Sequence, residues 1–387
     1  MTTLPAPHPA AQMISEKLAN KIREEIQQQN KPISFARFME LALYAPGLGY
    51  YRTGTHKFGR SGDFVTAPEI SPLFAKSVAR QCLQIIREID HCHILEFGAG
   101  SGVFAKDVLL ELEKLNALPD HYFILEISGE LRDRQMNLFK TACPHLLSRI
   151  SWLDTLPTVS FNGIIFANEV LDAMPVHCFE VTENTIEERC ISLENNHFVW
   201  RTQPTAHELK AYLDSILQGY SLPIGYQSEA NLIQPAWIAT LADCLTKGVI
   251  LLIDYGYSRH EYYHPERSQG TLMCFYQHHH HADPFVLVGL QDITAHVDFT
   301  HIAESADIAG LTVSGFTTQA AFLLSNGLLD IADESTLTEV EKYKQNQEIK
   351  ILTMPGQMGE IVKVMGLTKN LDISLLGFSL QDRRSDL

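Results

Sequence analysis

One segment of the sequence, ILEFGAGSGVF at residues 94–104, constrains the fold more than any other. Its apolar residues predict a buried strand over 93–97, and a helix is expected to begin at Val103. Between them lie three glycines at alternate positions, Gly98, Gly100 and Gly102. Glycine lets a ligand come close to the backbone because it has no Cβ, and the first turn of a helix offers unpaired N–H groups. This order of strand, glycine turn and helix indicates a nucleotide-type binding site.

Strand and helix patterns alternate around and after this turn. Further β-type runs lie at 121–127, 149–153, 162–168, 248–256, 311–319 and 360–369. Helical periodicity follows the first strands at 103–116 and 129–142, and more helices are expected at 229–246 and 294–310. The run at 248–256 is continuously apolar, as expected of a strand that is covered on both faces. The alternation predicts a doubly wound α/β fold with a parallel sheet.

The remaining segments divide the chain into parts. Residues 1–80 are expected to be an N-terminal helical and loop segment that covers the ligand site. The sheet core is assigned to residues 81–176, 229–256 and 294–387. Residues 177–228 begin with short β-type runs separated by polar turns, which predicts an inserted antiparallel and helical subdomain. Residues 257–293 show little periodicity, so we expect a lid loop there.

Charge and cysteine content narrow the functional classes. The chain has 30 basic and 46 acidic residues, a net charge of −16. This balance argues against nucleic acid as a partner, which requires a basic surface, and is compatible with a basic protein partner. The seven cysteines are scattered without a Cys-x-x-Cys pair, which favours a reducing compartment, and we expect a cytoplasmic protein. No apolar run is long enough for a membrane span. A homodimer is compatible with the sequence.

The details of the glycine turn indicate which ligand it binds. The dinucleotide fingerprint requires Gly or Ala where Val103 stands, and it has no acid at the position of Glu96. A NAD-type oxidoreductase is therefore disfavoured, and a phosphate-binding Walker loop lacks its G-K-[ST] signature. An acid before G-x-G-x-G is the pattern of S-adenosylmethionine-dependent methyltransferases. We expect Glu96 to meet the methionine ammonium of that cofactor, directly or through water.

Other polar residues follow the ends of successive strands. Glu126 is expected to accept the ribose hydroxyls, as an acid does in dinucleotide folds, and Asp154 the adenine amino group. Asn168 ends the next strand and is expected to contribute to the cofactor site. The three acids Glu96, Glu126 and Asp154 are expected at the carboxyl edge of the sheet, where open α/β sheets bind ligands. A loop with Gly62, Asp63, Thr66 and Glu69 is expected to fold over the cofactor and exclude water.

With these residues in hand, the chain resembles the MidA-type methyltransferases. The resemblance covers about residues 32–366 and rests on separated strings: SFARFMELALYAPGLGYY, SGDFVTAPEISPLF, ILEFGAGSG, NEVLDAMPV, LLIDYGY, GTLMCF and LQDITAHVDF. It implies a seven-stranded class I methyltransferase sheet with added helical and lid segments. The family includes a mitochondrial complex I assembly factor that methylates an arginine. The resemblance therefore implies a protein substrate that carries an arginine, with a respiratory-complex subunit as a suggestion.

An arginine acceptor gives roles to the remaining acids. Carboxylates can hold a guanidinium through paired hydrogen bonds, and Glu169 and Asp172 are the catalytic candidates. Asp254 and Tyr257, at the end of the next strand, are expected to support the substrate site. His296 and Asp298 are expected to line the acceptor pocket, and His296 is a candidate proton acceptor.

The histidine run and the class of methyl acceptor each leave alternatives. The run His278–His281 departs from the H-x-x-H pattern of the family, and its outer residues look like family positions in the lid. No metal is expected, because no nearby Cys or carboxylate set completes a coordination shell. The alternatives to a protein methyltransferase are a non-catalytic assembly chaperone that binds the cofactor, and a methyltransferase for a small molecule or a nucleic acid. The acidic balance and the absence of an N-P-P-[YF] string argue against nucleic acid.

Overall fold

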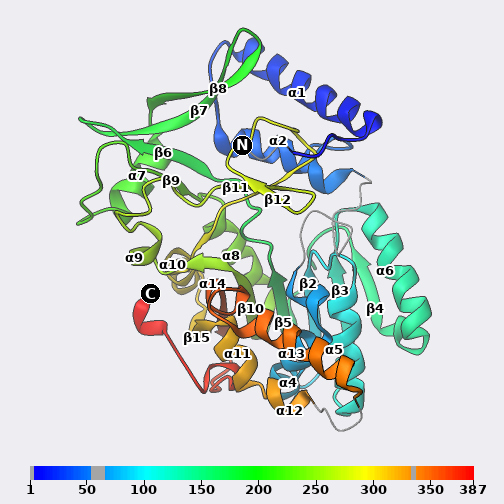
Figure 1. Cartoon of the computed structure of the whole chain (residues 1–387). Coiled ribbons are helices and arrows are strands. Elements are labelled where there is room, and N and C mark those ends of the chain that lie inside the picture. Colours follow the sequence, from blue (N-terminus) through cyan, green and yellow to red (C-terminus); the bar gives the residue numbers. More distant parts are fainter. Residues whose placement is uncertain (1–3, 54–65, 333–336) are drawn as a thin grey trace. The chain divides into compact units, whose positions relative to one another are not determined.

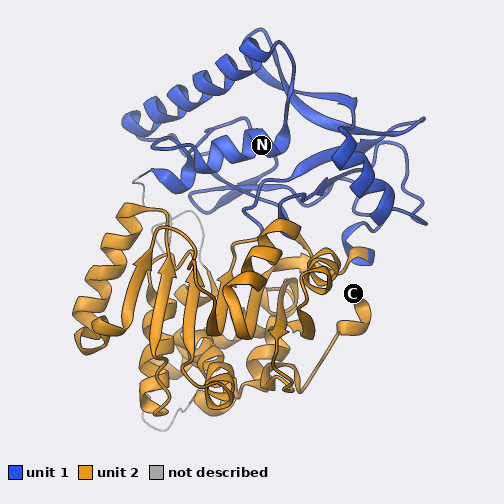
Figure 2. Ribbon diagram, turned by 180° about the vertical axis from the view of Figure 1, so that it is seen from behind, with its two compact units in different colours: residues 1–64, 172–234, 260–296 blue, residues 65–171, 235–259, 297–387 orange. Residues whose placement is uncertain are grey.

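The computed structural model describes residues 4–53, 66–332 and 337–387, so the expected cofactor residues Gly62 and Asp63 lie outside the described residues. The chain forms two compact units, each built from several stretches of sequence (Figure 2). Unit 1 consists of residues 1–64, 172–234 and 260–296, and unit 2 of residues 65–171, 235–259 and 297–387.

The main sheet of unit 2 has eight strands (Figure 1). They are β2 (His93–Phe97), β3 (His121–Leu125), β4 (Ile150–Leu153), β5 (Phe161–Asn168), β10 (Leu245–Tyr257), β14 (Val297–Asp298), β15 (Thr312–Thr318) and β16 (Val362–Lys369). Seven follow the order β15-β16-β10-β5-β2-β3-β4, and the two-residue β14 pairs with the end of β10. Strands β4, β3, β2, β5 and β10 run parallel, so their carboxyl ends meet at one edge.

Helices cover both faces of this sheet, as a doubly wound fold requires. On one face, Phe104 of α5 (Val103–Lys114) meets Phe166 of β5 edge-to-face, with ring centroids 5.4 Å apart. Helix α4 (Pro72–Glu88) packs beside α5 in the same apolar core. On the other face, Trp237 of α8 (Gln234–Cys244) packs edge-to-face on Phe97 of β2, with ring centroids 5.5 Å apart. The α/β fold class is thus confirmed.

The prediction of a parallel sheet and the start of one predicted helix needed correction. The sheet is mixed, because β16 runs antiparallel to both β10 and β15. An apolar run covered on both faces carries no mark of its direction, so the pattern could not show this. The helix expected over 294–310 begins only at Phe299, as α10 (Phe299–Ile308), because Asp298 caps it and the preceding residues form β14.

Unit 1 has an antiparallel five-stranded sheet of β1 (Ile33–Ser34), β6 (His177–Val181), β7 (Ile186–Glu194), β8 (His197–Pro204) and β9 (Gln227–Ala230). The antiparallel meander predicted after residue 177 is confirmed by the pairing of β6 with β7 and of β7 with β8. The helix expected from residue 229 starts later, because residues 227–230 pair with β6 as a strand. Apolar residues of α1 (Pro9–Gln29) and α2 (Phe35–Tyr44) belong to the core of this unit.

The segment expected as an irregular lid loop has regular structure. Strands β11 (Met273–Tyr276), β12 (His279–His281) and β13 (Asp292–Thr294) form a three-stranded antiparallel sheet. The prediction that this segment lacks regular elements was therefore wrong. Strands of three or four residues are too short to show a period of two in a sequence.

The unit boundaries differ from the expected division. Residues 65–80 were assigned to the N-terminal segment, but α4 packs on α5 and β5, so they belong to unit 2. Residues 172–176 were assigned to the sheet core, but Ala173 and Val176 are buried in the apolar core of unit 1. The N-terminal segment, the insertion and the segment expected as a lid thus share one unit.

The two units contain further helical elements. They are α3 (Ala67–Ile70), α6 (Gly129–Ala142), α7 (His207–Ile216), α9 (Arg259–Tyr262), α11 (Gln319–Ser325), α12 (Leu328–Ile331), α13 (Glu339–Thr353) and α14 (Met358–Ile361), and the 3-10 turns η1 (Tyr50–Arg52), η2 (Pro144–Arg149), η3 (Leu376–Phe378) and η4 (Arg384–Asp386). Among the described residues, no helix has the length and apolar character needed to cross a membrane. The seven cysteines are buried as free thiols.

Candidate functional site

The glycine turn lies between β2 and α5, at the edge where the parallel strands end. Gly98, Gly100 and Gly102 all have left-handed backbone conformations, with φ of 59°, 54° and 84°. The Gly98 N–H donates to the Leu125 carbonyl at 3.0 Å, and the Gly102 N–H to the Ala99 carbonyl at 2.8 Å. Residues with a Cβ adopt these φ values only at a cost. The turn therefore requires glycine for its shape as well as for ligand approach.

Glu96 lies on β2, two residues before the turn. Its side chain is 4% exposed, and Tyr122 Oη donates a 2.8 Å hydrogen bond to Glu96 Oε2. Burial raises the pKa of Glu96 to about 8; the nearby Glu126 adds to this rise and the Tyr122 hydrogen bond opposes it. A cation bound beside this carboxylate would restore its charged form. This electrostatic environment fits the ammonium group of S-adenosylmethionine.

Glu126 follows the last residue of β3 and is also 4% exposed. Its Oε1 accepts the Ser128 N–H at 2.9 Å, and its Oε2 accepts Gln135 Nε2 at 3.3 Å. Gln135 Nε2 also donates to the Gly100 carbonyl at 2.9 Å, so one amide joins the acid to the glycine turn. Burial raises the pKa of Glu126, and the hydrogen bonds from Ser128 and Gln135 counteract that rise. Gln135 is a site residue that no motif marked.

Asp154 stands apart from these buried acids. Its side chain is 87% exposed, and Asp154 Oδ1 forms a 2.8 Å ion pair with Arg132. Arg132 Nε also donates to the Glu126 carbonyl at 2.6 Å, so Arg132 links the ends of β3 and β4. Its Nη2 donates to the Leu153 carbonyl at 2.5 Å. Arg132 is a second residue that sequence reasoning missed, because the two carbonyls lie far apart in sequence. The adenine role of Asp154 stays a prediction.

Two residues of the expected covering loop are described. Thr66 precedes the first residue of α3, and its carbonyl accepts the N–H of Glu69 at 3.0 Å. The carboxylate of Glu69 accepts a hydrogen bond from Ser101 Oγ, which lies within the glycine turn. The structure thus brings Glu69 to the turn, while the Thr66 carbonyl bonds to the first turn of α3. The expected cofactor role of Thr66 stays a prediction.

Asn168 and Glu169 stand at the carboxyl end of β5. Asn168 Oδ1 is buried and accepts no hydrogen bond from any residue that the structure describes. Glu169 has a φ of 51°, which is uncommon for a residue with a side chain. Val170 borders the glycine turn, since a Cβ built on Gly98 would lie 3.7 Å from its Cγ2. This places the end of β5 beside the turn. Unusual backbone conformations of this kind cluster at functional sites.

Asp254 and Tyr257 both lie near the end of β10. Asp254 is fully buried, and its Oδ2 accepts the N–H groups of Val170 and Leu171 at 3.1 and 2.8 Å. Tyr257 is the last residue of β10, and Lys363 Nζ lies 5.7 Å from its ring centroid. The structure therefore brings Asp254 to the end of β5 through backbone groups. The expected substrate roles of both residues stay predictions.

Asp298 caps α10 and pairs with an arginine. Its Oδ1 accepts the N–H groups of Thr300 and His301 at 3.0 and 3.2 Å, and its Oδ2 lies 3.1 Å from Arg259 Nε. The side chain is 6% exposed, and burial raises the pKa of Asp298 to about 6 against the lowering effect of Arg259. These contacts give Asp298 a structural role, and its place in an acceptor pocket stays a prediction.

Asp172 and His296 belong to unit 1. Asp172 is 8% exposed, and its carbonyl accepts the Ala295 N–H at 2.9 Å, next to His296. The N–H of His296 donates to Thr271 Oγ1 at 3.0 Å.

Unit 1 also contains a buried pair of tyrosines. Tyr51 Oη donates to Asp292 Oδ1 at 2.9 Å, and the ring of Tyr51 stacks on that of Tyr44. The carboxylates of Asp292 and Asp172 add to the burial that raises the pKa of both tyrosines. Sequence reasoning did not single out Tyr44, Tyr51 or Asp292.

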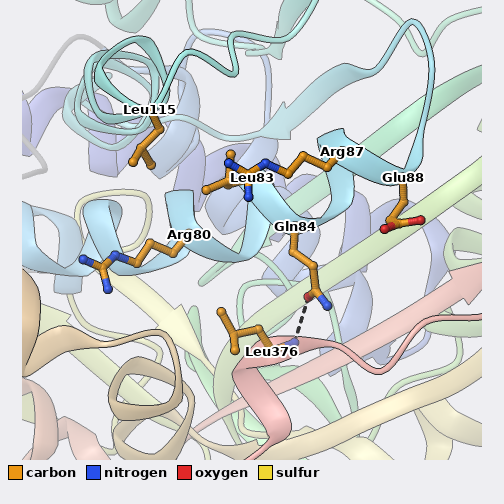
Figure 3. A pocket seen from close by; sticks show the side chains of 7 residues that line it. All are labelled: Arg80, Leu83, Gln84, Arg87, Glu88, Leu115 and Leu376. Carbon is orange, nitrogen blue, oxygen red and sulfur yellow. Dashed lines mark hydrogen bonds between the residues drawn. The ribbon is translucent and has the colours of Figure 1, made fainter.

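A pocket of about 520 Å³ lies over α4, with Arg80, Leu83, Gln84, Arg87 and Glu88 from that helix and Leu115 and Leu376 opposite (Figure 3). Leu115 follows the end of α5, about 18 Å along the helix from the glycine turn. None of the residues that line this pocket is a candidate site residue.

In the described part of the chain, no group of three His, Cys, Asp or Glu side chains is placed to hold a metal ion. Within the histidine run, burial lowers the pKa of His281.

The residues of unit 2 fit S-adenosylmethionine. Three glycines in left-handed conformations present backbone without side chains, and two buried carboxylates, Glu96 and Glu126, lie beside them. The buried Asn168 Oδ1 leaves a hydrogen-bond acceptor at the same edge. Glu96 would hold the ammonium and Glu126 the ribose hydroxyls.

Known proteins share this sequence and fold. A family model described as "Putative S-adenosyl-L-methionine-dependent methyltransferase" matches residues 77–317. The protein arginine methyltransferase NDUFAF7 homolog of Drosophila melanogaster is 27% identical over 390 residues, which cover 90% of this chain and 84% of the relative. The human protein arginine methyltransferase NDUFAF7 is 26% identical, with 92% of this chain and 83% of the relative covered. Both are described as mitochondrial.

A solved structure is closer still. A crystal structure from Burkholderia thailandensis, bound to S-adenosyl-homocysteine, is 41% identical and superposes with a TM-score of 0.95 over 100% of both chains. The family model spans more than half of this chain, and its cofactor is S-adenosylmethionine. The chain therefore belongs to the MidA-type family of S-adenosylmethionine-dependent methyltransferases.

Proposed function

We propose that this methyltransferase acts on an arginine side chain of a protein. The observation that carries the proposal is the match, over 85–92% of this chain, to relatives named protein arginine methyltransferases. By its resemblance to the complex I assembly factor, we further propose that the acceptor belongs to a respiratory-complex subunit. The acidic balance of the chain supports a basic acceptor.

The residues of the site would act mainly by positioning. The bound cofactor supplies an electrophilic methyl group on a sulfonium. A guanidinium nitrogen forms a bond to the methyl carbon as the carbon–sulfur bond breaks, and the nitrogen gives up one proton. The guanidinium is a poor nucleophile because it is charged, with a pKa above about 12. Orientation of the two partners can supply about 7–11 kcal/mol of such a barrier.

Glu169 is the acid that we assign to the acceptor. It follows Asn168 at the end of β5 and borders the glycine turn through Val170. A carboxylate there would hold the guanidinium by paired hydrogen bonds and accept the proton that leaves the nitrogen. Asp172 and His296, from unit 1, remain the other candidates for this chemistry.

The proposal is tested by incubating the purified protein with methyl-labelled S-adenosylmethionine and cell extract. Label on an arginine of a protein, located by mass spectrometry after digestion, is the expected result. Label on lysine, on a small molecule or on nucleic acid would overturn the arginine assignment. Cofactor binding without transfer to any acceptor would favour an assembly chaperone. The variant Gly100→Val serves as the control for label that does not depend on this site.

A further inference from the structure

Asp254 holds the turn that carries Glu169. It is fully buried on β10, and its two carboxylate oxygens accept three backbone N–H groups. Oδ2 accepts those of Val170 and Leu171 at 3.1 and 2.8 Å, and Oδ1 that of Tyr255 at 2.8 Å. Hydrogen bonds from backbone N–H groups to a carboxylate are about twice as strong as those between neutral groups.

The N–H of Glu169 is held from the same strand. It donates to the carbonyl of Ile253, the neighbour of Asp254, at 2.8 Å. Three successive N–H groups, those of residues 169, 170 and 171, therefore bond to two successive residues of β10. This arrangement stabilises the left-handed conformation of Glu169, whose φ is 51°. A residue with a Cβ does not keep such a conformation unless its surroundings enforce it.

We propose that Asp254 is a positioning residue for methyl transfer, which acts on the reaction through the backbone of the 169–171 turn. The inference rests on the role proposed for Glu169, and it replaces the expected direct contact of Asp254 with substrate. Because the turn leaves β5 beside Gly98, its backbone conformation decides where the Glu169 carboxylate lies relative to the glycine turn. Displacement of a reacting group by about 1 Å can cost about 100-fold in rate.

The test is the near-isosteric variant Asp254→Asn. Asparagine has an amide nitrogen in place of one carboxylate oxygen, and this nitrogen cannot accept a hydrogen bond. The backbone N–H groups that were bonded to that oxygen therefore lose their acceptor. We expect kcat for the labelled acceptor to fall about 10- to 100-fold. The affinity for S-adenosylmethionine, measured by calorimetry, is expected to stay within about threefold of wild type, because Glu96 and Glu126 are untouched. Hydrogen exchange of a peptide over residues 168–174 is expected to become faster, which reports the turn without turnover.

Asp382→Asn is the matched control. Asp382 also accepts two backbone N–H groups, from Phe316 and Arg384. Phe316 lies on β15, which is separated from β10 by β16. This variant is expected to lose stability without a change in kcat. A fall in kcat for Asp382→Asn as large as that for Asp254→Asn would show that stability, and not positioning, governs turnover.

The double variant with Glu169→Gln distinguishes positioning from a separate role. If Asp254 acts through Glu169, the double variant is no slower than the worse single variant. Multiplied losses, or an unchanged kcat in Asp254→Asn with faster exchange, would overturn the inference. These assays use whichever acceptor takes the label. An acceptor other than arginine would thus refute the proposed substrate while leaving the test of Asp254 intact.

Discussion

Tyr122 donates a 2.8 Å hydrogen bond to Glu96 across the neighbouring strands β3 and β2, beside the glycine turn. The pair is buried, and the pKa of Glu96 is raised to about 8 by burial. A carboxyl group with a raised pKa in the folded state binds its proton more tightly there than in the unfolded chain. Its contribution to stability is therefore fully present below pH 4.5 and is lost as the pH rises towards 8.

The first prediction follows from this sign. The free energy of unfolding of the cofactor-free protein is expected to lose about 1.4 kcal/mol per pH unit through Glu96 in that window. Glu96→Gln mimics the protonated acid, so the variant should match wild type below about pH 4.5 and exceed it near pH 8.5. Denaturant unfolding across this pH range measures the free energy of unfolding of both proteins. The difference between the two values cancels the contributions of other groups such as Asp298, which both proteins share. Parallel curves for the two proteins would contradict the raised pKa.

The second prediction concerns Gly100, whose φ of 54° lies in the left-handed region. Gly100→Val is expected to abolish cofactor binding while the protein stays folded, because valine adds both backbone strain and bulk where the ligand comes close. Gly310→Val is the control, since Gly310 has a φ of 73° and open space around its Cβ position. Both variants should lose stability, but only the first should lose binding in calorimetric titration. Unchanged affinity in Gly100→Val would remove the turn from the cofactor site.

Much of the cofactor side of the site could be predicted because it depends on local chemistry. The glycines at 98, 100 and 102 and the acids at strand ends can be recognised from the sequence pattern. The structure places Glu96 and Glu126 beside the turn. The burial of a side chain and its hydrogen-bond partners cannot be recognised from the sequence pattern. Asp154 and Asp254 look alike in sequence, yet one is 87% exposed and the other is fully buried on backbone N–H groups.

The fold shows the same division. Long strands and amphipathic helices were predicted because each repeats its pattern over several residues. The direction of β16 was not, because its pairing with β10 and β15 depends on contacts between segments far apart in the chain. The contribution of Gln135 and Arg132 also depends on such contacts, since each joins α6 to two strand ends.

The third prediction concerns the ion pair of Arg259 with Asp298, at 3.1 Å. Arg259→Met leaves a buried carboxylate without its cation, which is expected to cost about 3–5 kcal/mol of stability at neutral pH. Arg259 lowers the pKa of Asp298, so the variant's carboxyl has a pKa above the wild-type value of about 6 and is protonated first as the pH falls. The deficit should therefore shrink as the pH falls towards 6 and stay constant below it. Arg384→Met is the control, because Arg384 pairs with Asp382 near the surface, where a pair contributes about 1 kcal/mol or less. Equal losses in the two variants would contradict the structural importance of the buried pair.

The fourth prediction separates cofactor binding from methyl transfer at the end of β5. Glu169→Gln keeps the shape of the side chain and removes its charge, so the fold and the left-handed backbone at this position should persist. Because Glu169 is assigned to the acceptor, the affinity for S-adenosylmethionine should stay within about threefold, while kcat falls by about 100-fold or more, the range expected for loss of a general base. Calorimetry and single-turnover assays measure the two quantities separately. If cofactor affinity falls and the rate per bound cofactor holds, Glu169 belongs to the cofactor site, and Asp172 or His296 becomes the candidate for the acceptor.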